Sequence, residues 1–250
     1  MASSLKGSFA YKIDIGKIRI SNDDQAFACT NSQKEVFLIV CDGMGGANKG
    51  DYASRMAIEV MKDAFASKGR TSPFFAKRWM IRALKKANKA VYRESISNPA
   101  YDGMGTTCVC ALLLGDKMVI GNIGDSRAYA YDGKNLIRLT SDDTVGDYLA
   151  RVKGLSEEDV AASEERHILT NAVGVFATAS STVKVLPYHK QTILLCSDGL
   201  YNNVPESGIR SCLSTDDRVD EKVNALIAEA NGNGGSDNVG ISLWECRSNG

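Results

Sequence analysis

The stretch LLCSDGLYNN (194–203) ends an apolar run with an Asp-Gly pair, and LIVCDGMGGA (38–47) does the same. Asp-Gly is a frequent hairpin turn, so a turn is the first explanation to test. Strands of similar length flank Asp132-Gly133, which we expect to be an ordinary turn. After Asp42 and Asp198 no second strand follows directly. We therefore expect these two aspartates to end buried strands at a sheet edge, where a rigid scaffold presents their side chains.

The apolar pattern around these stretches predicts an α+β protein. Residues 105–140 should form consecutive antiparallel strands that turn at 115–117 and 132–133, and 141–170 are polar with weak helical periodicity. Other strands are expected over 7–14, 24–29, 35–43, 182–189, 192–199 and 239–247, and amphipathic helices over 51–67, 72–95 and 218–230. This order favours a layered sandwich of one domain spanning residues 1–250.

The helix expected over 72–95 has clear start signals. Ser72 is a candidate N-cap and Pro73 a candidate first helical residue. Helical spacing predicts an inward face made of Phe75, Trp79, Ala83, Leu84, Ala87 and Val91.

Composition excludes several classes of protein. The 250 residues suit one large domain or two small ones, and 30 basic residues balance 30 acidic ones. No basic stripe and no Lys/Arg block stands out, which argues against non-specific nucleic-acid binding. No apolar run approaches the roughly 20 residues of a membrane span, and the first residues lack an apolar secretory core. We expect a cytoplasmic monomer.

Cysteine and histidine usage narrows the possible chemistry. The seven cysteines include no paired CxxC zinc motif, and we expect free thiols packed as small apolar side chains in a reducing compartment. The only two histidines, His167 and His189, are far apart; we expect His167 at the surface and His189 to be structural or exposed. Two histidines this far apart argue against a Ser-His-Asp triad or a His-rich zinc site. A metal site would need oxygen ligands.

Further acidic residues share the placement of Asp42 and Asp198. They are Asp23 and Asp24 in RISNDDQAF, Asp125 in VIGNIGDSRAY, and Asp237 in GGSDNVGISL. A buried carboxylate is costly without a partner. Arg19 and Arg127 could pair with two of the set, and a divalent cation is the economical partner for the rest. Oxygen-only ligation favours Mg²⁺ or Mn²⁺, with Ca²⁺ as another option, and loop glycines at 43, 45 and 46 let backbone approach such a site.

With these motifs in hand, the chain resembles the metal-dependent PPM (type 2C) Ser/Thr protein phosphatases, specifically their compact bacterial members. The resemblance covers residues 19–243 in the order of the family. The matching stretches are RISNDD (19–24), VCDGMGGANKGDYAS (40–54), GMGTTCVCALL (103–113), IGNIGDSRAY (120–129), LTSDDT (139–144), LLCSDGLYNNV (194–204) and SDNVGISL (236–243).

The resemblance implies a four-layer αββα sandwich of two antiparallel sheets flanked by helices, with two core Mn²⁺ or Mg²⁺ ions. Asp42 is then expected to bridge the ions and the Gly43 carbonyl to bind one of them. Asp198 and Asp237 would hold the other, Asp23 and Asp24 would bind directly or through water, and Asp125 would help to bind a third ion. A hydroxide bridging the metals would attack phospho-Ser/Thr in proteins, with Arg19 binding the phosphate.

The resemblance also implies a mobile flap at 141–170 that discriminates substrates, and a bacterial Ser/Thr kinase that the enzyme opposes. Four positions depart from the common family pattern: Met44, Asp143, Asn171 and Gly240 stand where histidine, histidine, arginine and threonine are frequent. Met44 leaves the general acid unassigned. The alternatives are a regulatory phosphatase of an anti-sigma-antagonist type protein, against which Arg19 argues, and a non-catalytic module of the same fold, against which the intact aspartate set argues.

Overall fold

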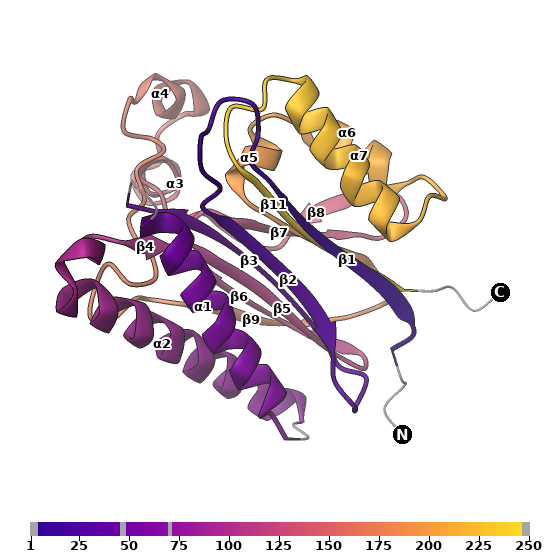
Figure 1. Cartoon of the computed structure of the whole chain (residues 1–250). Coiled ribbons are helices and arrows are strands. Elements are labelled where there is room, and N and C mark those ends of the chain that lie inside the picture. Colours follow the sequence, from indigo (N-terminus) through magenta and orange to yellow (C-terminus); the bar gives the residue numbers. More distant parts are fainter. Residues whose placement is uncertain (1–4, 46–48, 70–71, 247–250) are drawn as a thin grey trace.

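Two antiparallel sheets lie face to face between two sets of helices, which confirms the predicted αββα arrangement (Figure 1). The computed structural model describes residues 5–45, 49–69 and 72–246. In the first sheet the order is β1 (Gly7–Asp14), β11 (Val239–Cys246), β10 (Thr192–Cys196), β7 (Arg127–Tyr131) and β8 (Leu136–Arg138). In the second it is β2 (Asp24–Thr30), β3 (Val36–Met44), β5 (Cys108–Leu114), β6 (Lys117–Ile123) and β9 (Thr182–Pro187), with β4 (Gly105–Thr106) paired to the end of β3.

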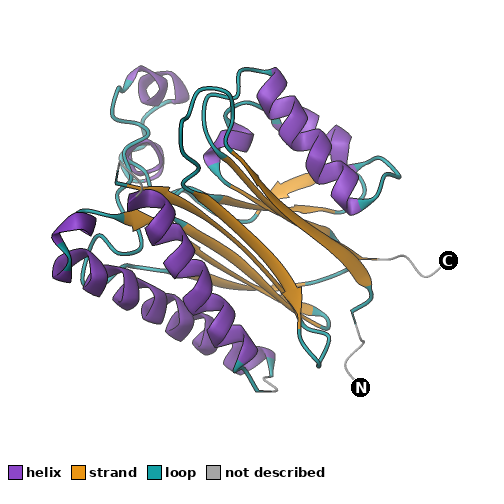
Figure 2. Cartoon of the chain, in the orientation of Figure 1, coloured by secondary structure: helices purple, strands orange, loops and turns teal. Residues whose placement is uncertain are grey.

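Three apolar cores separate the four layers. Helices α1 (Lys49–Ala66) and α2 (Pro73–Ser97) cover the second sheet, and α5 (Asp198–Tyr201), α6 (Glu206–Leu213) and α7 (Val219–Gly232) cover the first (Figure 2). Along β3, Phe37 and Ile39 face the helices whereas Leu38 and Val40 face the other sheet. Because both faces of β3 are buried, its sequence is a continuous apolar run and not an alternating one.

The inward face of α2 differs from the prediction at one residue. Trp79, Ala83, Leu84, Ala87 and Val91 belong to the core or pack against it, as expected, but Phe75 is 55% exposed. The buried row of this helix begins at the next residue, Ala76, and one residue corresponds to about 100° of helix rotation, so Phe75 points outward. Ser72 is the N-cap residue as predicted, although its side chain makes no capping hydrogen bond.

The chain crosses between the sheets at residues 124–126, where an uninterrupted series of paired strands was predicted. The hairpins β5–β6 and β7–β8 form as expected, and the second confirms the turn at Asp132-Gly133. However, β6 and β7 belong to different sheets. Gly124 has a φ of +96°, a left-handed conformation that glycine adopts readily, and this allows the abrupt change of direction.

The polar stretch 141–170 contains two short helices, α3 (Val145–Arg151) and α4 (Glu157–Ala162), in agreement with its weak periodicity. Helices α5 and α6 and the 3-10 turn η1 (Pro99–Tyr101) were not predicted, since each is too short for a periodic signal. Within the described residues, no helix is both long and apolar enough to cross a membrane.

The expectation that the chain lacks a basic stripe is wrong. Helix α2 carries seven Lys and Arg residues and one acidic residue, Glu94. All seven basic side chains are exposed. Along the sequence these residues alternate with the apolar residues of the inward face. The linear sequence therefore contains no continuous basic block that would indicate a basic face.

Candidate metal centre

Asp24 and Asp42 face each other across two neighbouring strands. Asp24 is the first residue of β2, Asp42 lies near the end of β3, and the two are direct partners in the antiparallel pairing. Asp24 is only 1% exposed. Strand pairing therefore holds two carboxyl groups side by side at one end of the second sheet, an arrangement that is costly unless a cation or proton neutralises it.

Hydroxyl groups from the neighbouring strands fix the backbone of Asp42. The Thr107 hydroxyl accepts a hydrogen bond from the Asp42 amide at 2.9 Å, and the Thr106 hydroxyl donates to the Asp42 carbonyl at 2.9 Å. The Thr107 amide donates to the same carbonyl at 2.8 Å. Both threonines belong to the GTT stretch after Met104. This stretch thus has a structural reason to contain two hydroxyl residues, which the sequence alone did not reveal.

Ser197 links the two sheets at the site. It lies between β10 and Asp198, and its hydroxyl donates to Oδ2 of Asp24 at 2.6 Å. The same hydroxyl accepts from the amide of Gly240 in β11 at 2.7 Å. Asp198 follows directly, and its Oδ2 accepts a hydrogen bond from the Asn202 side chain at 3.1 Å. The acidic residues of the first sheet are therefore brought against those of the second.

Asn238 anchors the loop between β1 and β2 to the start of β11. Its side-chain amide donates to the carbonyls of Ile15 and Ser21, both at 2.9 Å, and its side-chain oxygen accepts from the amide of Asp23 at 2.9 Å. Asn238 is 7% exposed. The loop that carries Arg19 and Asp23 is thereby held beside Asp237.

Arg19 pairs with Asp237, a member of the acidic set with which it was expected to pair. Its guanidinium lies 2.7 Å from Oδ2 of Asp237, and its side chain is 55% exposed. This hydrogen bond and the negative charge of Asp237 raise the pKa of Arg19. Arg127, the other candidate partner, instead pairs with Asp142 at 2.8 Å and lies over the ring of Tyr201.

Two glycines allow α1 to begin against the site. A Cβ on Gly43 would lie 2.1 Å from the Gly50 carbonyl oxygen, and a Cβ on Gly50 would lie 2.6 Å from Oδ2 of Asp23. The Gly43 amide donates to the Asp23 carbonyl at 3.1 Å. Close backbone approach thus explains glycine directly after Asp42. Gly45 has a φ of +129°, and Gly46, which was also assigned to this loop, lies outside the described residues.

The electrostatics of the set are unfavourable without a cation. Burial and the charges of Asp198 and Asp237 raise the pKa of Asp24 to about 8. Burial and the charge of Asp237 raise the pKa of Asp198 to about 6. The pKa of Asp42 lies well above its ordinary value because of burial and the nearby Asp24 and Asp198 carboxylates. Burial also raises the pKa of Asp23.

Asp125 lies in the crossover between β6 and β7, not within a strand. Its pKa rises to about 7 because of burial and the charges of Asp198 and Asp142. The Tyr201 hydroxyl donates to its carbonyl at 3.2 Å. Asp125 therefore lies close enough to Asp198 for their charges to interact, although it belongs to the connection between the two sheets.

Two of the departures from the family pattern contact each other. The Asn171 side chain donates to Oδ2 of Asp143 at 2.7 Å, and the same oxygen accepts from the Gly124 amide at 3.0 Å. The Thr170 amide donates to the Asp143 carbonyl at 2.8 Å. These bonds close the base of the segment 145–169 and attach it to the loop of Asp125. The two residues that stand where histidine and arginine are frequent in the family are thus hydrogen-bonded to each other in this chain.

The donor set fits a hard divalent cation. Among the described residues, the buried Oδ1 atoms of Asp23 and Asp24 have no hydrogen-bond partner, and carboxylate oxygens are the ligands that such a cation prefers. Yet no three His, Cys, Asp or Glu side chains in the described ranges already form a group that could hold a metal ion. Arg19 occupies Oδ2 of Asp237, so Asp237 would have to release Arg19 to bind a cation through that atom. Ser197 occupies only Oδ2 of Asp24 and leaves its Oδ1 available.

Comparison with known proteins decides the family. The family model described as Protein phosphatase 2C matches residues 18–232. The chain belongs to this family. It is 36% identical over 239 residues to the serine/threonine phosphatase stp of Listeria monocytogenes, with 94% of each protein covered. The resemblance to type 2C phosphatases is confirmed.

Solved structures of this phosphatase family match the whole fold. The serine/threonine phosphatase Stp1 from Staphylococcus aureus has a TM-score of 0.90 and 29% identity, covering 99% of this chain and 97% of that one. The catalytic domain of the phosphatase PstP in complex with two manganese ions has a TM-score of 0.84 and 26% identity, covering 98% and 100%. The predicted fold class is thereby confirmed as well.

The site contains residues whose roles the sequence pattern did not indicate. Ser197, Asn238, Thr106 and Thr107 were quoted within motifs but were not assigned. Each lies next to an acidic residue in sequence or carries a hydroxyl in a small-residue stretch, and these are the only signals that could have pointed to them. His167 is exposed, as predicted, and His189 is exposed, which was one of the two alternatives for it.

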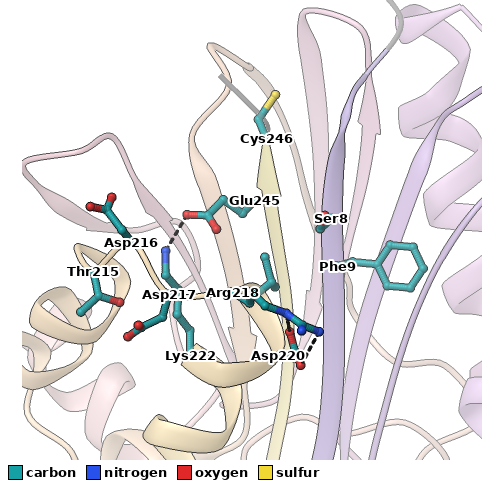
Figure 3. A pocket seen from close by; sticks show the side chains of 11 residues that line it. Ser8, Phe9, Thr215, Asp216, Asp217, Arg218, Asp220, Lys222, Glu245 and Cys246 are labelled. Atoms are coloured by element: carbon teal, nitrogen blue, oxygen red, sulfur yellow. Dashed lines mark hydrogen bonds and ion pairs between the residues drawn. The ribbon is translucent and has the colours of Figure 1, made fainter. Parts of the chain in front are cut away.

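A separate hollow of about 890 Å³ lies at the far end of β11 from Asp237. Figure 3 shows its side chains, including the ion pair between Lys222 and Glu245. The ammonium of Lys222 is buried and also donates to the Leu213 carbonyl, so it is neutralised within the fold. This hollow takes no part in the metal centre.

Proposed function

We propose that this chain hydrolyses phosphoserine and phosphothreonine in protein substrates at a divalent-metal centre that includes Asp24, Asp42, Asp198 and Asp237. The observation that carries the proposal is the convergence of these carboxyl groups. They come from four separate segments. The pKa of Asp42 is raised by the negative charges of four other aspartates, Asp24, Asp198, Asp125 and Asp237. A cation is the partner that such a set requires.

The carboxylates and the Gly43 carbonyl would hold two core Mn²⁺ or Mg²⁺ ions. Asp23 lies at the edge of the set with an unpartnered buried oxygen, and Asp125 would contribute to a third, weaker position. The two manganese ions of the PstP catalytic domain support this number of core ions. When bound, the ions supply positive charge and acidify water next to the phosphoryl group.

The chain's own residues would bind and orient the substrate. Arg19 is exposed on the loop between β1 and β2, and its planar guanidinium matches two phosphate oxygens. Its present partner, Asp237, is one of the proposed ligands, so release of Asp237 toward a cation would free Arg19 for phosphate. Asn238 keeps the loop in place during this exchange, because its three hydrogen bonds involve only backbone groups of the loop.

Finer features of the biology belong to the same proposal. Residues 141–170 would act as a flap that discriminates substrates, and the substrates would include a Ser/Thr kinase that this enzyme opposes. We propose a cytoplasmic monomer whose residues 1–250 form one catalytic domain. The free thiols support a reducing compartment, since all seven cysteines are unpaired and four of them are buried.

The proposal is tested by hydrolysis of p-nitrophenyl phosphate and of a phosphothreonine peptide with Mn²⁺. We expect activity that EDTA abolishes, and a loss of at least about 100-fold in kcat for Asp198→Asn. Asp132→Asn is the matched control, because Asp132 precedes glycine in an ordinary exposed turn. A manganese-loaded protein without activity, or equal activities of both variants, would overturn the assignment.

A further inference from the structure

The outer face of α2 presents basic side chains that lack partners within the described part of the chain. The helix contains seven Lys and Arg residues and one acidic residue, although the whole chain has no net charge. None of the seven forms an ion pair or donates a side-chain hydrogen bond to another described residue: Lys77, Arg78, Arg82, Lys85, Lys86, Lys89 and Arg93. Such a face attracts an anionic partner.

A groove of about 540 Å³ opens along the C-terminal half of this face. Lys85, Lys89 and Arg93 line it on the helix, one helical turn apart from one another. Its apolar lining includes Tyr92 and Ile96, and Ile96 is 64% exposed. Basic groups beside exposed apolar surface are suited to a chain that carries both acidic and apolar side chains.

The opposite wall of the groove is the segment 177–179, which is fixed to α2. The Asn88 side chain donates to the carbonyls of Phe176 at 3.1 Å and Ala177 at 3.3 Å, and accepts from the Gly174 amide at 2.8 Å. Asn88 is 3% exposed. A buried side chain therefore attaches this wall of the groove to α2, which forms the outer layer on this side together with α1 (Figure 1).

The same wall leads to the metal centre. Val173 exchanges backbone hydrogen bonds with Thr106, whose hydroxyl donates to the Asp42 carbonyl. A Cβ on Gly105 would lie 2.7 Å from Val175 and 2.9 Å from Met44, so Val175 lies close to Met44, the last residue of β3. Residues 173 to 177 span at most about 14 Å of chain. An extended segment of about four to eight residues would reach from one site to the other.

We propose that this groove binds an acidic segment, containing an apolar residue, of the same phosphoprotein whose phosphorylated side chain enters the metal centre. The inference rests on the proposed phosphatase function and adds a determinant of substrate choice outside the flap. A protein segment is favoured over an anionic lipid surface because the groove is concave and walled on both sides, which a bilayer could not fill.

The test compares two phosphothreonine peptides that differ only in a block of Asp and Glu with one Leu, replaced in the second peptide by Asn, Gln and Ser. The block is placed about four to eight residues from the phosphothreonine, on either side. For the wild-type chain at low salt we expect kcat/KM to favour the acidic peptide about fivefold to tenfold, since one exposed ion pair contributes up to about a factor of five. Lys85→Glu/Lys89→Glu should reduce this preference to within about twofold.

Two further variants separate the groove from general charge. Lys134→Glu/Lys190→Glu makes the same change of charge at two exposed turns away from α2 and should keep the preference. Ile96→Ser removes only the apolar contact from an exposed position, so it should fold normally and raise KM for the acidic peptide. Hydrolysis of p-nitrophenyl phosphate, which is too small to span to the groove, should be unchanged in all three.

The outcomes are distinguishable. Equal kcat/KM for the two peptides, or equal loss of preference in both double variants, would overturn the docking proposal while leaving the phosphatase intact. Binding of the wild type to anionic vesicles or an oligonucleotide without a preference between the peptides would assign the basic face to that surface instead. Fluorescence anisotropy measures peptide binding in parallel, so groove-dependent binding without hydrolysis of any substrate would contradict the proposed function and not the groove.

Discussion

At the scale of single residues, Ser197 is the link on which the centre depends. Its hydroxyl serves a carboxylate from one sheet and a backbone amide from the other. The Cβ that Gly240 lacks would lie 3.2 Å from Oδ2 of Asp24, so a larger residue would compete with Ser197 for this space. Glycine at position 240 thus leaves room for the hydrogen bond between Ser197 and Asp24.

Ser197→Ala should destabilise the protein because it leaves the Gly240 amide without its side-chain acceptor and Asp24 without its donor. We expect the free energy of unfolding in metal-free buffer to fall by about 1–3 kcal/mol. Urea denaturation followed by circular dichroism measures it. Ser236→Ala is the control: that serine is exposed and should cost no more than about 0.5 kcal/mol. Equal losses in the two variants would show that the link between the sheets carries no special stability.

At the scale of elements, the loop between β1 and β2 is positioned by β11 and not by its own sequence. Residues 15–23 contain no strand or helix, yet they supply Arg19 and Asp23. Asn238 accounts for this order with three hydrogen bonds to backbone groups at both ends of the loop. The position of Arg19 therefore depends on Asn238, the residue directly before β11.

Asn238→Ala should loosen this loop. We expect faster amide hydrogen exchange over 15–23, with exchange in β1 and β2 little changed, and a rise of about tenfold in KM for a phosphopeptide because Arg19 is no longer held near the centre. Hydrogen exchange followed by mass spectrometry gives the first readout and steady-state kinetics the second. Asn135→Ala, in the exposed β7–β8 turn, should change neither. Unaltered exchange in 15–23 would disprove the anchoring role.

At the scale of the whole molecule, the metal-free centre makes stability depend on pH. Asp198, Asp125 and Asp24 have pKa values of about 6, 7 and 8 in the folded chain, above the ordinary carboxyl value. The folded protein therefore binds more protons than the unfolded chain between about pH 4 and pH 8, so its stability falls as pH rises through this window. A bound cation needs ionised ligands and should reverse the trend.

We expect the melting temperature in EDTA to fall between about pH 5.5 and pH 8.5, and the stabilisation by Mn²⁺ to grow over the same interval. Circular dichroism melts at several pH values provide the measurement. Asp24→Asn removes one of the titrating groups and should flatten the metal-free dependence. A metal-free melting temperature that rises steadily toward pH 8.5 would contradict the electrostatic description of the site.

Much of the fold was predictable because strands that are buried on both faces have continuous apolar sequences. The apolar run before Asp42 and that before Asp198 are central strands covered by helices on one face and by the other sheet on the opposite face. The crossover at 124–126 was not predictable, since a three-residue change of sheet and a three-residue hairpin have similar composition. Short helices such as α5 lack the length over which periodicity becomes visible.

The candidate site was predictable as a set of acidic residues but not as a set of contacts. Carboxylates at strand ends identified Asp42, Asp198 and Asp237, whereas the partner of Arg19 is 218 positions away in the sequence and follows only from the fold. Likewise, the balance of total charge concealed the basic face of α2, because that balance says nothing about where the charges lie.

The central claim is that carboxylates from four segments converge on a divalent-metal centre. Anomalous diffraction from crystals of the protein soaked in Mn²⁺ tests it most directly. We expect two strong manganese peaks beside Asp42, with Asp24, Asp198 and Asp237 within coordinating distance, and Arg19 released from Asp237. Strong peaks elsewhere, or none at this site in a protein that hydrolyses phosphopeptides with Mn²⁺, would contradict the account.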